Sequence, residues 1–141
     1  MFIKRYKLCL VMLASVISFY PVLTRGDNAD SAVPLQVDAN GKQHFQIRGG
    51  SYFFKPDHIV VKVNIPVVLS ISREWGIIPH TFVLKIPESG IMIDESMSTD
   101  PKTITFTPTV TGNFEYYCKN KFLFFKSHEK KGMKGTLEVI P

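Results

Sequence analysis

The chain has 141 residues, enough for one compact domain with a hydrophobic core and too few for two domains of ordinary size. Hydrophobic residues make up 45% of the chain, with 9 Gly and 9 Pro, which excludes a disordered chain and fits a globular protein with many turns.

Residues 1–25 have the layout of a secretory signal peptide. Three basic residues, Lys4, Arg5 and Lys7, precede an apolar run over residues 8–19, and a polar stretch follows. This run is shorter than the roughly 17 to 25 residues of a transmembrane helix, so an uncleaved N-terminal anchor is the less favoured alternative. We therefore expect export, to the periplasm or beyond, with no stable membrane insertion after signal cleavage.

The formal net charge of +5 lies mostly in this segment. Four of the 17 basic residues and none of the 12 acidic residues fall within 1–25, which leaves 13 basic and 12 acidic residues and a net charge of +1. A nearly neutral chain gives no support for binding to nucleic acid.

After a polar lead-in over residues 26–42, the domain proper is expected over 43–141. It contains eight short stretches that alternate apolar and polar side chains and are rich in Val, Ile, Thr, Phe and Tyr, as half-buried strands are. Turn-forming Gly and Pro residues separate them, and residues 88–100 are expected to hold a short helix or an irregular loop. We expect an all-β monomer, an antiparallel sandwich or barrel of about eight strands. The strands are expected at 44–48, 52–55, 58–63, 67–72, 81–86, 103–107, 113–118 and 135–140.

Cys118 is the one cysteine left after the signal segment, which contains Cys9, is removed. An exported chain with a lone cysteine forms no internal disulfide. A free thiol in an oxidising compartment is a liability unless it is buried, catalytic or bound to metal. Catalytic use would need a third polar group and an oxyanion element that the sequence does not offer.

Two histidines and a methionine complete a candidate metal site with this cysteine. Cys118, His128 and Met133 fall within sixteen residues between the last two predicted strands, and His80 opens an earlier strand. Taken singly, each histidine or methionine is as readily a core residue. Together, one thiolate, two imidazoles and one thioether are the ligand set of a mononuclear type 1 copper site, with one ion cycling between Cu(I) and Cu(II).

The motifs around these residues resemble those of a known family. Pro-His-x-Phe at 79–82, Gly-x-Phe-x-Tyr-x-Cys at 112–118 and His-x4-Met-x-Gly-x-Leu-x-Val at 128–139 are similar to the plastocyanin, pseudoazurin and rusticyanin group of cupredoxins. The resemblance spans roughly residues 43–141. It implies a Greek-key β-sandwich in which Met133 is the axial copper ligand. It also implies a one-electron carrier, not an enzyme, that serves larger redox proteins of the cytochrome or oxidase type.

One departure from the family pattern is the length of the ligand loop. Nine residues, Lys119–Ser127, separate Cys118 from His128, whereas the small family members have only a few there, so the loop must bulge. The loop contains four successive apolar residues, 122–125, among several lysines. They are expected either to close the end of the core or to form an apolar patch with a basic rim that docks on an acidic redox partner.

Other functions are compatible with parts of the sequence. The same ligands would serve copper resistance, delivery or storage, whereas a catalytic copper domain would need a second copper site. His44 and His58 share no motif with another ligand type and are expected to be structural or surface residues. Asp94 and Glu95 are expected on a solvated face and not as an acid–base pair.

Overall fold

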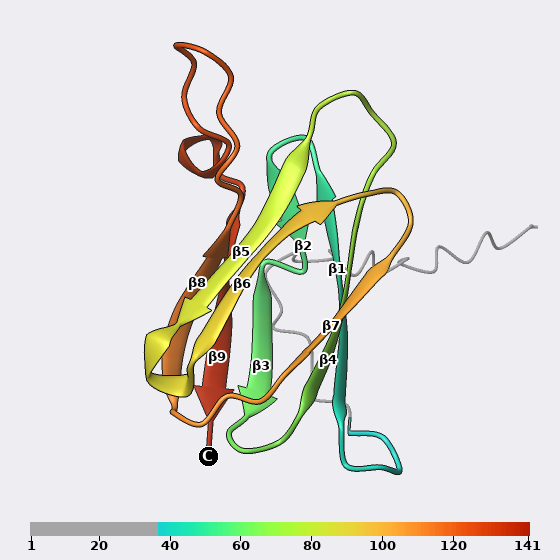
Figure 1. The fold of residues 1–141 in the computed structure, drawn as a ribbon, viewed down its shortest axis with the longest axis vertical. Coiled ribbons are helices and arrows are strands. Elements are labelled where there is room, and N and C mark those ends of the chain that lie inside the picture. Colours follow the sequence, from blue (N-terminus) through green and yellow to red (C-terminus); the bar gives the residue numbers. More distant parts are fainter. Residues whose placement is uncertain (1–36) are drawn as a thin grey trace, which may run out of the picture.

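The computed structural model describes residues 37–141, so the predicted signal peptide and most of the lead-in lie outside the described residues. These described residues form nine strands and two short 3₁₀ helices (Figure 1). Among the described residues, no helix is long and apolar enough to cross a membrane. The elements are β1 (Gln43–Gly50), β2 (Phe53–Lys55), β3 (His58–Lys62), β4 (Val67–Arg73), β5 (His80–Ile86), η1 (Pro87–Ser89), β6 (Ile91–Met97), β7 (Lys102–Phe106), β8 (Gly112–Tyr117), η2 (Glu129–Lys131) and β9 (Lys134–Ile140).

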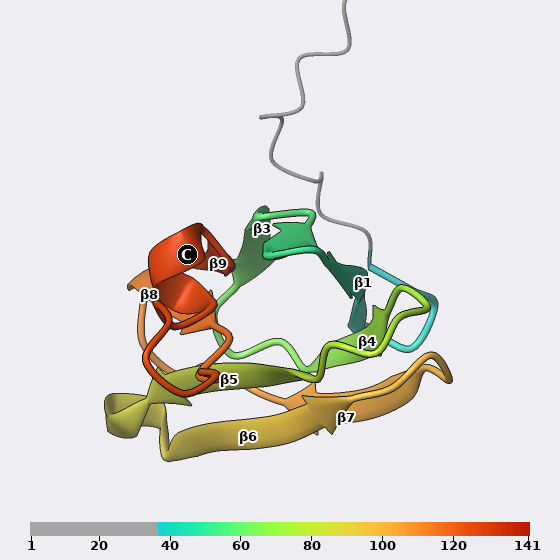
Figure 2. The ribbon, with the colours of Figure 1, turned by 90° about the horizontal axis from the view of Figure 1, so that it is seen from above.

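The strands form two sheets that enclose one core (Figure 2). One sheet has the order β2-β1-β4-β7, and the other has the order β3-β9-β8-β5-β6. The predicted all-β sandwich is therefore confirmed. It is not purely antiparallel, because β1 pairs with β4 and β3 pairs with β9 in parallel. These partners are distant in sequence, and side-chain alternation shows where a strand lies but not its neighbour's direction.

The expectation of a short helix or irregular loop over residues 88–100 was wrong for most of this segment. After η1 the chain forms β6, which pairs with β5 along its whole length at the edge of the larger sheet. Three consecutive polar residues, Asp94 to Ser96, obscured the strand pattern. The carboxylates of Asp94 and Glu95 lie on the surface, as expected, and form ion pairs with Lys119 and Lys102 respectively.

Side chains that alternate inward from both sheets fill the core, as in a β-sandwich. Phe54, Phe82 and Tyr116 meet at its centre, with ring centroids 5.3–5.9 Å apart. The Tyr116 hydroxyl donates a hydrogen bond to the Pro56 carbonyl at 2.8 Å, so the only polar atom of this buried ring has a partner. Burial raises the pKa of Tyr116, which stays neutral.

Gly135 of β9 leaves room for this tyrosine. A Cβ at position 135 would lie 2.4 Å from the Tyr116 ring and 2.5 Å from the Asp57 carbonyl oxygen, both closer than atoms can approach. We expect Gly135→Ala to lower the free energy of unfolding by about 1–3 kcal/mol, because a packed core resists an added carbon. Urea unfolding measures this. Thr107→Ala, at an exposed site, should stay within about 0.5 kcal/mol of wild type, and equal stability of the two variants would contradict the packing argument.

Candidate metal centre

The four predicted ligands lie where strands end at one end of the sandwich. His80 is the first residue of β5, Cys118 directly follows β8, and Met133 directly precedes β9. His128 is the N-cap of η2, inside the loop that joins β8 to β9. All four side chains are buried, with 6% or less of each residue exposed.

Three candidate ligand atoms lie close together. His80 Nδ1 and His128 Nδ1 lie 3.2 Å apart, and Cys118 Sγ lies 4.0 Å from the first and 3.5 Å from the second. A point equidistant from these three atoms is about 2.1 Å from each. This is close to the roughly 2.0–2.1 Å at which zinc binds imidazole nitrogen and the roughly 2.3 Å at which it binds thiolate sulfur. In the part of the chain that the structure describes, this is the one cluster of three or more His, Cys or acidic groups with metal-site spacing.

Backbone hydrogen bonds fix the ligand loop from within. Cys118 N–H donates to the Met133 carbonyl at 3.0 Å, and Met133 N–H donates to the His128 carbonyl at 2.9 Å. Glu129 N–H donates to the Cys118 carbonyl at 3.2 Å. The residues that carry the sulfur, the imidazole and the thioether are thus tied to one another directly.

The nine-residue segment between Cys118 and His128 bulges outward, as expected, and His128 still lies in the cluster. His128 N–H donates to the Asn120 carbonyl at 2.9 Å, which closes the base of the loop two residues after Cys118. Residues 121–127 then extend beyond the sandwich, as the top of Figure 1 shows. The unusual spacing therefore adds a projection and does not displace the second histidine.

Two polar residues that the sequence pattern did not reveal surround the sulfur. Thr81 N–H donates to Cys118 Sγ at 3.4 Å, and its hydroxyl donates to Asn120 Oδ1 at 2.8 Å. Asn120 Oδ1 lies 3.6 Å from Sγ, and the backbone N–H of Lys119 binds the Thr81 hydroxyl at 3.2 Å. The sulfur thus lies between a backbone N–H donor and a side-chain amide oxygen. The only sequence signal was adjacency, since Thr81 follows His80 and Asn120 lies two residues after Cys118.

Met133 reaches across to the opposite sheet. A Cβ at Gly49 of β1 would lie 3.1 Å from the terminal methyl carbons of both Met133 and Met97. Glycine at this position gives the ends of both thioether side chains room. Met97 pairs with His80 in the β5–β6 ladder, and no motif in the sequence marked it.

Both imidazoles are held neutral. Burial lowers the pKa of His80 to about 4, and the nearby His128 and Arg73 add to the effect. Burial likewise lowers the pKa of His128, with a further contribution from Lys131. A neutral imidazole has a lone pair to offer a metal, whereas a protonated one has none.

An apolar pocket opens above His128. It has a volume of about 520 Å³ and lies between the ligand loop, the 77–79 segment and Tyr52. The Tyr52 ring meets the His128 ring edge-on at 4.9 Å, and Lys131 Nζ lies over Tyr52 at 4.1 Å. His128 is thus the member of the cluster that borders this pocket, while Cys118 and Met133 are fully covered.

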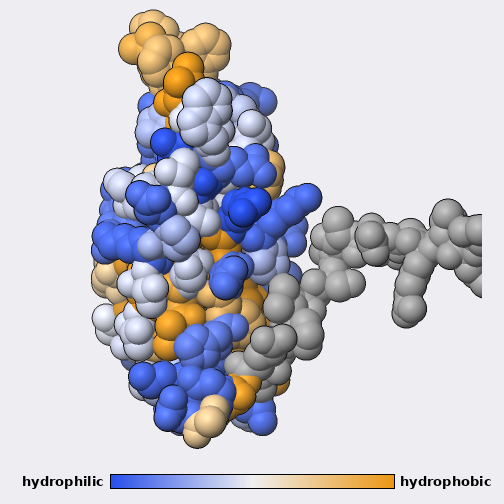
Figure 3. All heavy atoms as spheres, turned by 90° about the vertical axis from the view of Figure 1, so that its right-hand side faces the viewer, coloured by the Kyte–Doolittle hydropathy of each residue, from blue (hydrophilic) through white to orange (hydrophobic). Residues whose placement is uncertain are grey.

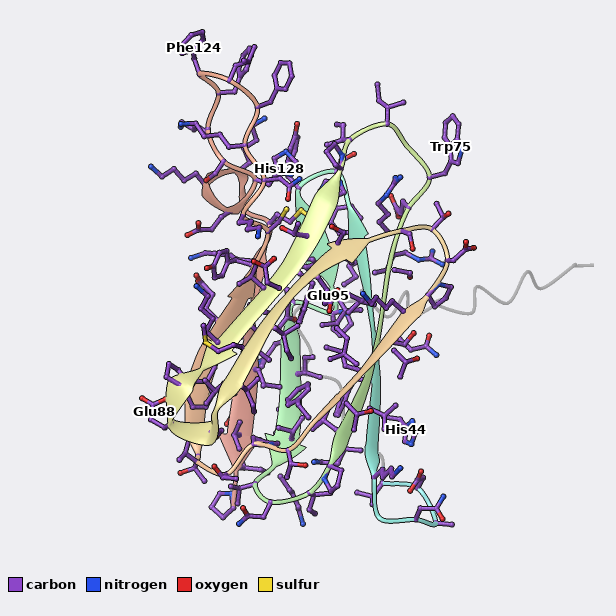
Figure 4. All side chains as sticks on the ribbon, viewed as in Figure 1. His44, Trp75, Glu88, Glu95, Phe124 and His128 are labelled. Carbon is purple, nitrogen blue, oxygen red and sulfur yellow. The ribbon has the colours of Figure 1, made fainter. Side chains whose placement is uncertain are left out.

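The other two described histidines lie outside the cluster, as predicted. His44 Nε2 lies 2.7 Å from an Asp38 carboxylate oxygen, and His58 Nε2 lies 2.9 Å from Glu138 Oε2. Each histidine has an acidic partner, and neither belongs to a group of side chains with metal-site spacing among the described residues. Figure 4 shows His44 at the end of the sandwich opposite His128.

No family model and no curated protein sequence matches the chain. Solved structures do. The metal-binding domain of the Cu(I)-exporting P-type ATPase of Streptococcus pneumoniae is 23% identical, with a TM-score of 0.58 over 79% of this chain and 98% of that domain. Auracyanin B is 19% identical, with a TM-score of 0.54 over 79% and 96%. Auracyanin A of Chloroflexus aurantiacus, a blue copper protein, is 16% identical, with a TM-score of 0.53 over 71% and 100%. The chain therefore has the cupredoxin fold.

The lowered histidine pKa values predict acid sensitivity of the metal-free protein. Both folded-state pKa values lie below the ordinary value of 6.5, so the unfolded chain binds protons that the folded chain does not. Stability should fall as the pH drops below about 6.5, by up to about 1.4 kcal/mol per pH unit for His80, until its folded-state pKa near 4 is reached. Urea unfolding between pH 7.5 and 5 measures this slope. The slope should be shallower in His80→Asn, and an identical slope would contradict the assignment.

Proposed function

We propose that the chain is an exported, mononuclear copper protein that carries single electrons between redox proteins. The ligands would be Nδ1 of His80 and His128, Sγ of Cys118 and the thioether of Met133. The observation that carries this proposal is the buried triangle of two imidazole nitrogens and a sulfur, spaced for one metal ion. Thiolate and thioether favour Cu(I), and imidazole suits both oxidation states. The auracyanin folds support the same class of protein.

A bound copper ion would supply the one-electron chemistry, and the chain supplies rigidity. His80 is fixed by the β5–β6 ladder, and Cys118 and Met133 are fixed by hydrogen bonds between their own backbones. Ligands held in this way move little when the charge at the site changes. A small rearrangement is what fast electron exchange requires, because preorganised groups need not reorient.

Electrons would enter and leave through His128. His128 borders the apolar pocket, whereas His80 lines a separate pocket together with the charged residues Arg73 and Glu74, and Cys118 is completely covered. A redox protein, of the cytochrome or oxidase type, would dock at this end of the sandwich and approach the imidazole edge. The buried sulfur would stay protected from oxidants in solution.

Copper delivery is the alternative function, and burial argues against it. A delivery protein passes its ion by exchanging ligands with the acceptor, so a thiolate that the acceptor can reach is an advantage. Here Cys118 is 0% exposed. Catalysis would need a second site, and His44 and His58 are each bound to a carboxylate instead. We therefore infer a carrier and not an enzyme.

The Cu(II)-loaded protein is expected to show an intense visible thiolate-to-copper band. Cys118→Ala should lose the band, and His128→Ala should alter or lose it, because each variant lacks one of the three atoms of the proposed ligand triangle. Optical and paramagnetic-resonance spectra measure this. His44→Ala is the matched control and should keep the wild-type spectrum, since His44 lies outside the cluster. A wild-type protein that binds Cu(II) without such a band would refute the proposed site.

Met133→Leu tests the axial ligand. The visible band should persist, because the triangle of nitrogens and sulfur is retained, and the reduction potential should rise, because Cu(II) loses a weak donor. Voltammetry should give one reversible one-electron wave for both proteins. Met92→Leu, at an exposed site on β6, should leave the potential unchanged. An unaltered potential in Met133→Leu would remove Met133 from the ligand set, and an irreversible wild-type wave would favour copper delivery.

A further inference from the structure

The bulging part of the ligand loop presents four consecutive apolar residues to solvent. Phe122, Leu123, Phe124 and Phe125 are each between 61% and 98% exposed. They do not close the end of the core, which was one of the two readings of the sequence. They project from the molecule as an apolar tip, at the top of Figure 3, and Figure 4 places Phe124 at its far end. Exposed apolar patches mark sites of interaction.

This apolar tip (residues 122–125) has a defined shape. Phe125 N–H donates to the Phe122 carbonyl at 3.0 Å, and the two rings stack with centroids 6.2 Å apart. Leu123 has a positive φ of 44°, as the tight turn requires. The bond between Asn120 and His128 closes its base. The chain therefore holds these side chains outward.

A second loop adds apolar residues at the same end. Trp75 is 92% exposed and Ile77 is 96% exposed. Arg73 holds this loop in shape, because its guanidinium donates to the carbonyls of Glu74 and Gly76 at 3.1 and 2.7 Å. Ile77 lines the same pocket as residues of the tip, so the two loops form one apolar end.

Lysines surround the base of the tip. The span from 119 to 134 holds six lysines and one acidic residue, Glu129. Lys119 and Lys134 form ion pairs with strand residues. The ion pairs of the described residues include none of the other four lysines at the base of the tip, which are Lys121, Lys126, Lys130 and Lys131.

We propose that this end of the protein binds the surface of a bilayer that contains anionic lipids. Phe and Leu of the tip insert at the boundary between headgroups and acyl chains, Trp75 lies at the interface, and the lysines contact anionic headgroups. Trp and Tyr favour this interfacial depth, and lysine stems extend along apolar surface while their ammonium groups stay in water. Such binding goes beyond the proposed function and does not depend on bound copper.

The shape of the tip favours a bilayer over an acidic redox partner as its occupant. A protein partner whose surface covered the tip would need a matching pocket for four bulky side chains. A bilayer accepts a convex apolar projection without such complementarity. Membrane binding would also bring the proposed copper end close to redox proteins that reside in the membrane.

The sequence supplies its own reporter, because Trp75 is the only tryptophan. The exported form of the protein is mixed with vesicles of pure phosphatidylcholine, or of phosphatidylcholine with 30% phosphatidylglycerol. We expect Trp75 emission to shift to the blue with the anionic vesicles, and to be quenched when the acyl chains carry bromine. Binding should weaken in high salt. Unshifted emission and no quenching with anionic vesicles would overturn the proposal.

Variants distinguish this binding from any contribution of residues 26–36, which every variant of the exported form retains. Phe124→Ser should weaken partitioning about tenfold, since one exposed aromatic ring is lost. Lys121→Glu with Lys126→Glu should weaken it by about tenfold or more on anionic vesicles. Met92→Ser and Lys42→Glu, both exposed and away from the tip, are the matched controls and should bind as wild type does. If Phe124→Ser binds vesicles normally but slows electron exchange with a protein partner, the tip is a protein-docking site and the proposal is wrong.

Discussion

The register between β5 and β8 is the constraint on which the metal centre depends. Val83 lies opposite Tyr117, and Leu84 lies opposite Tyr116, so the ladder brings the start of β5 alongside the residues that follow β8. The contact between Thr81 N–H and the Cys118 sulfur follows from this alignment. A slip of one residue would turn every side chain of the strand to the opposite face. Phe82 and Tyr116, which pack in the core from the same two strands, hold the register, so core packing and ligand placement rest on one interaction.

Backbone hydrogen bonds and strand ends hold the cluster in place. Its nitrogen and sulfur atoms lie at metal-binding spacing because strand ends and short backbone bonds place them there. Burial keeps both imidazoles neutral, which suits them as ligands and costs stability in acid. A site fixed in this way would move little during the electron transfer that we propose for it. The same burial therefore lowers the stability of the protein in acid and keeps both imidazoles available to bind a metal.

The sequence predicted the grouping of His80, Cys118 and His128 better than what surrounds them. Cys118, His128 and Met133 share one loop, and their order and spacing were visible as a motif. Eight of the nine strands were also visible from alternation. β6 was not, because its central residues are charged and polar. Contacts made across the fold leave no local pattern, so the thioether of Met97 near Gly49 and the parallel pairs with β4 and β9 emerged only in three dimensions.

The hydrogen bond from His128 to the Asn120 carbonyl separates two parts of the ligand loop that are continuous in sequence. On one side of this bond lie the groups that form the cluster. On the other side lie residues 121–127, none of which forms a hydrogen bond to a nitrogen or sulfur atom of the cluster. Residues 121–127 are therefore structurally separate from the cluster. A change in the length or composition of residues 121–127 should therefore leave the geometry of the cluster unchanged. The surface that this end of the protein presents to its surroundings is thus separable from the residues that would hold the metal.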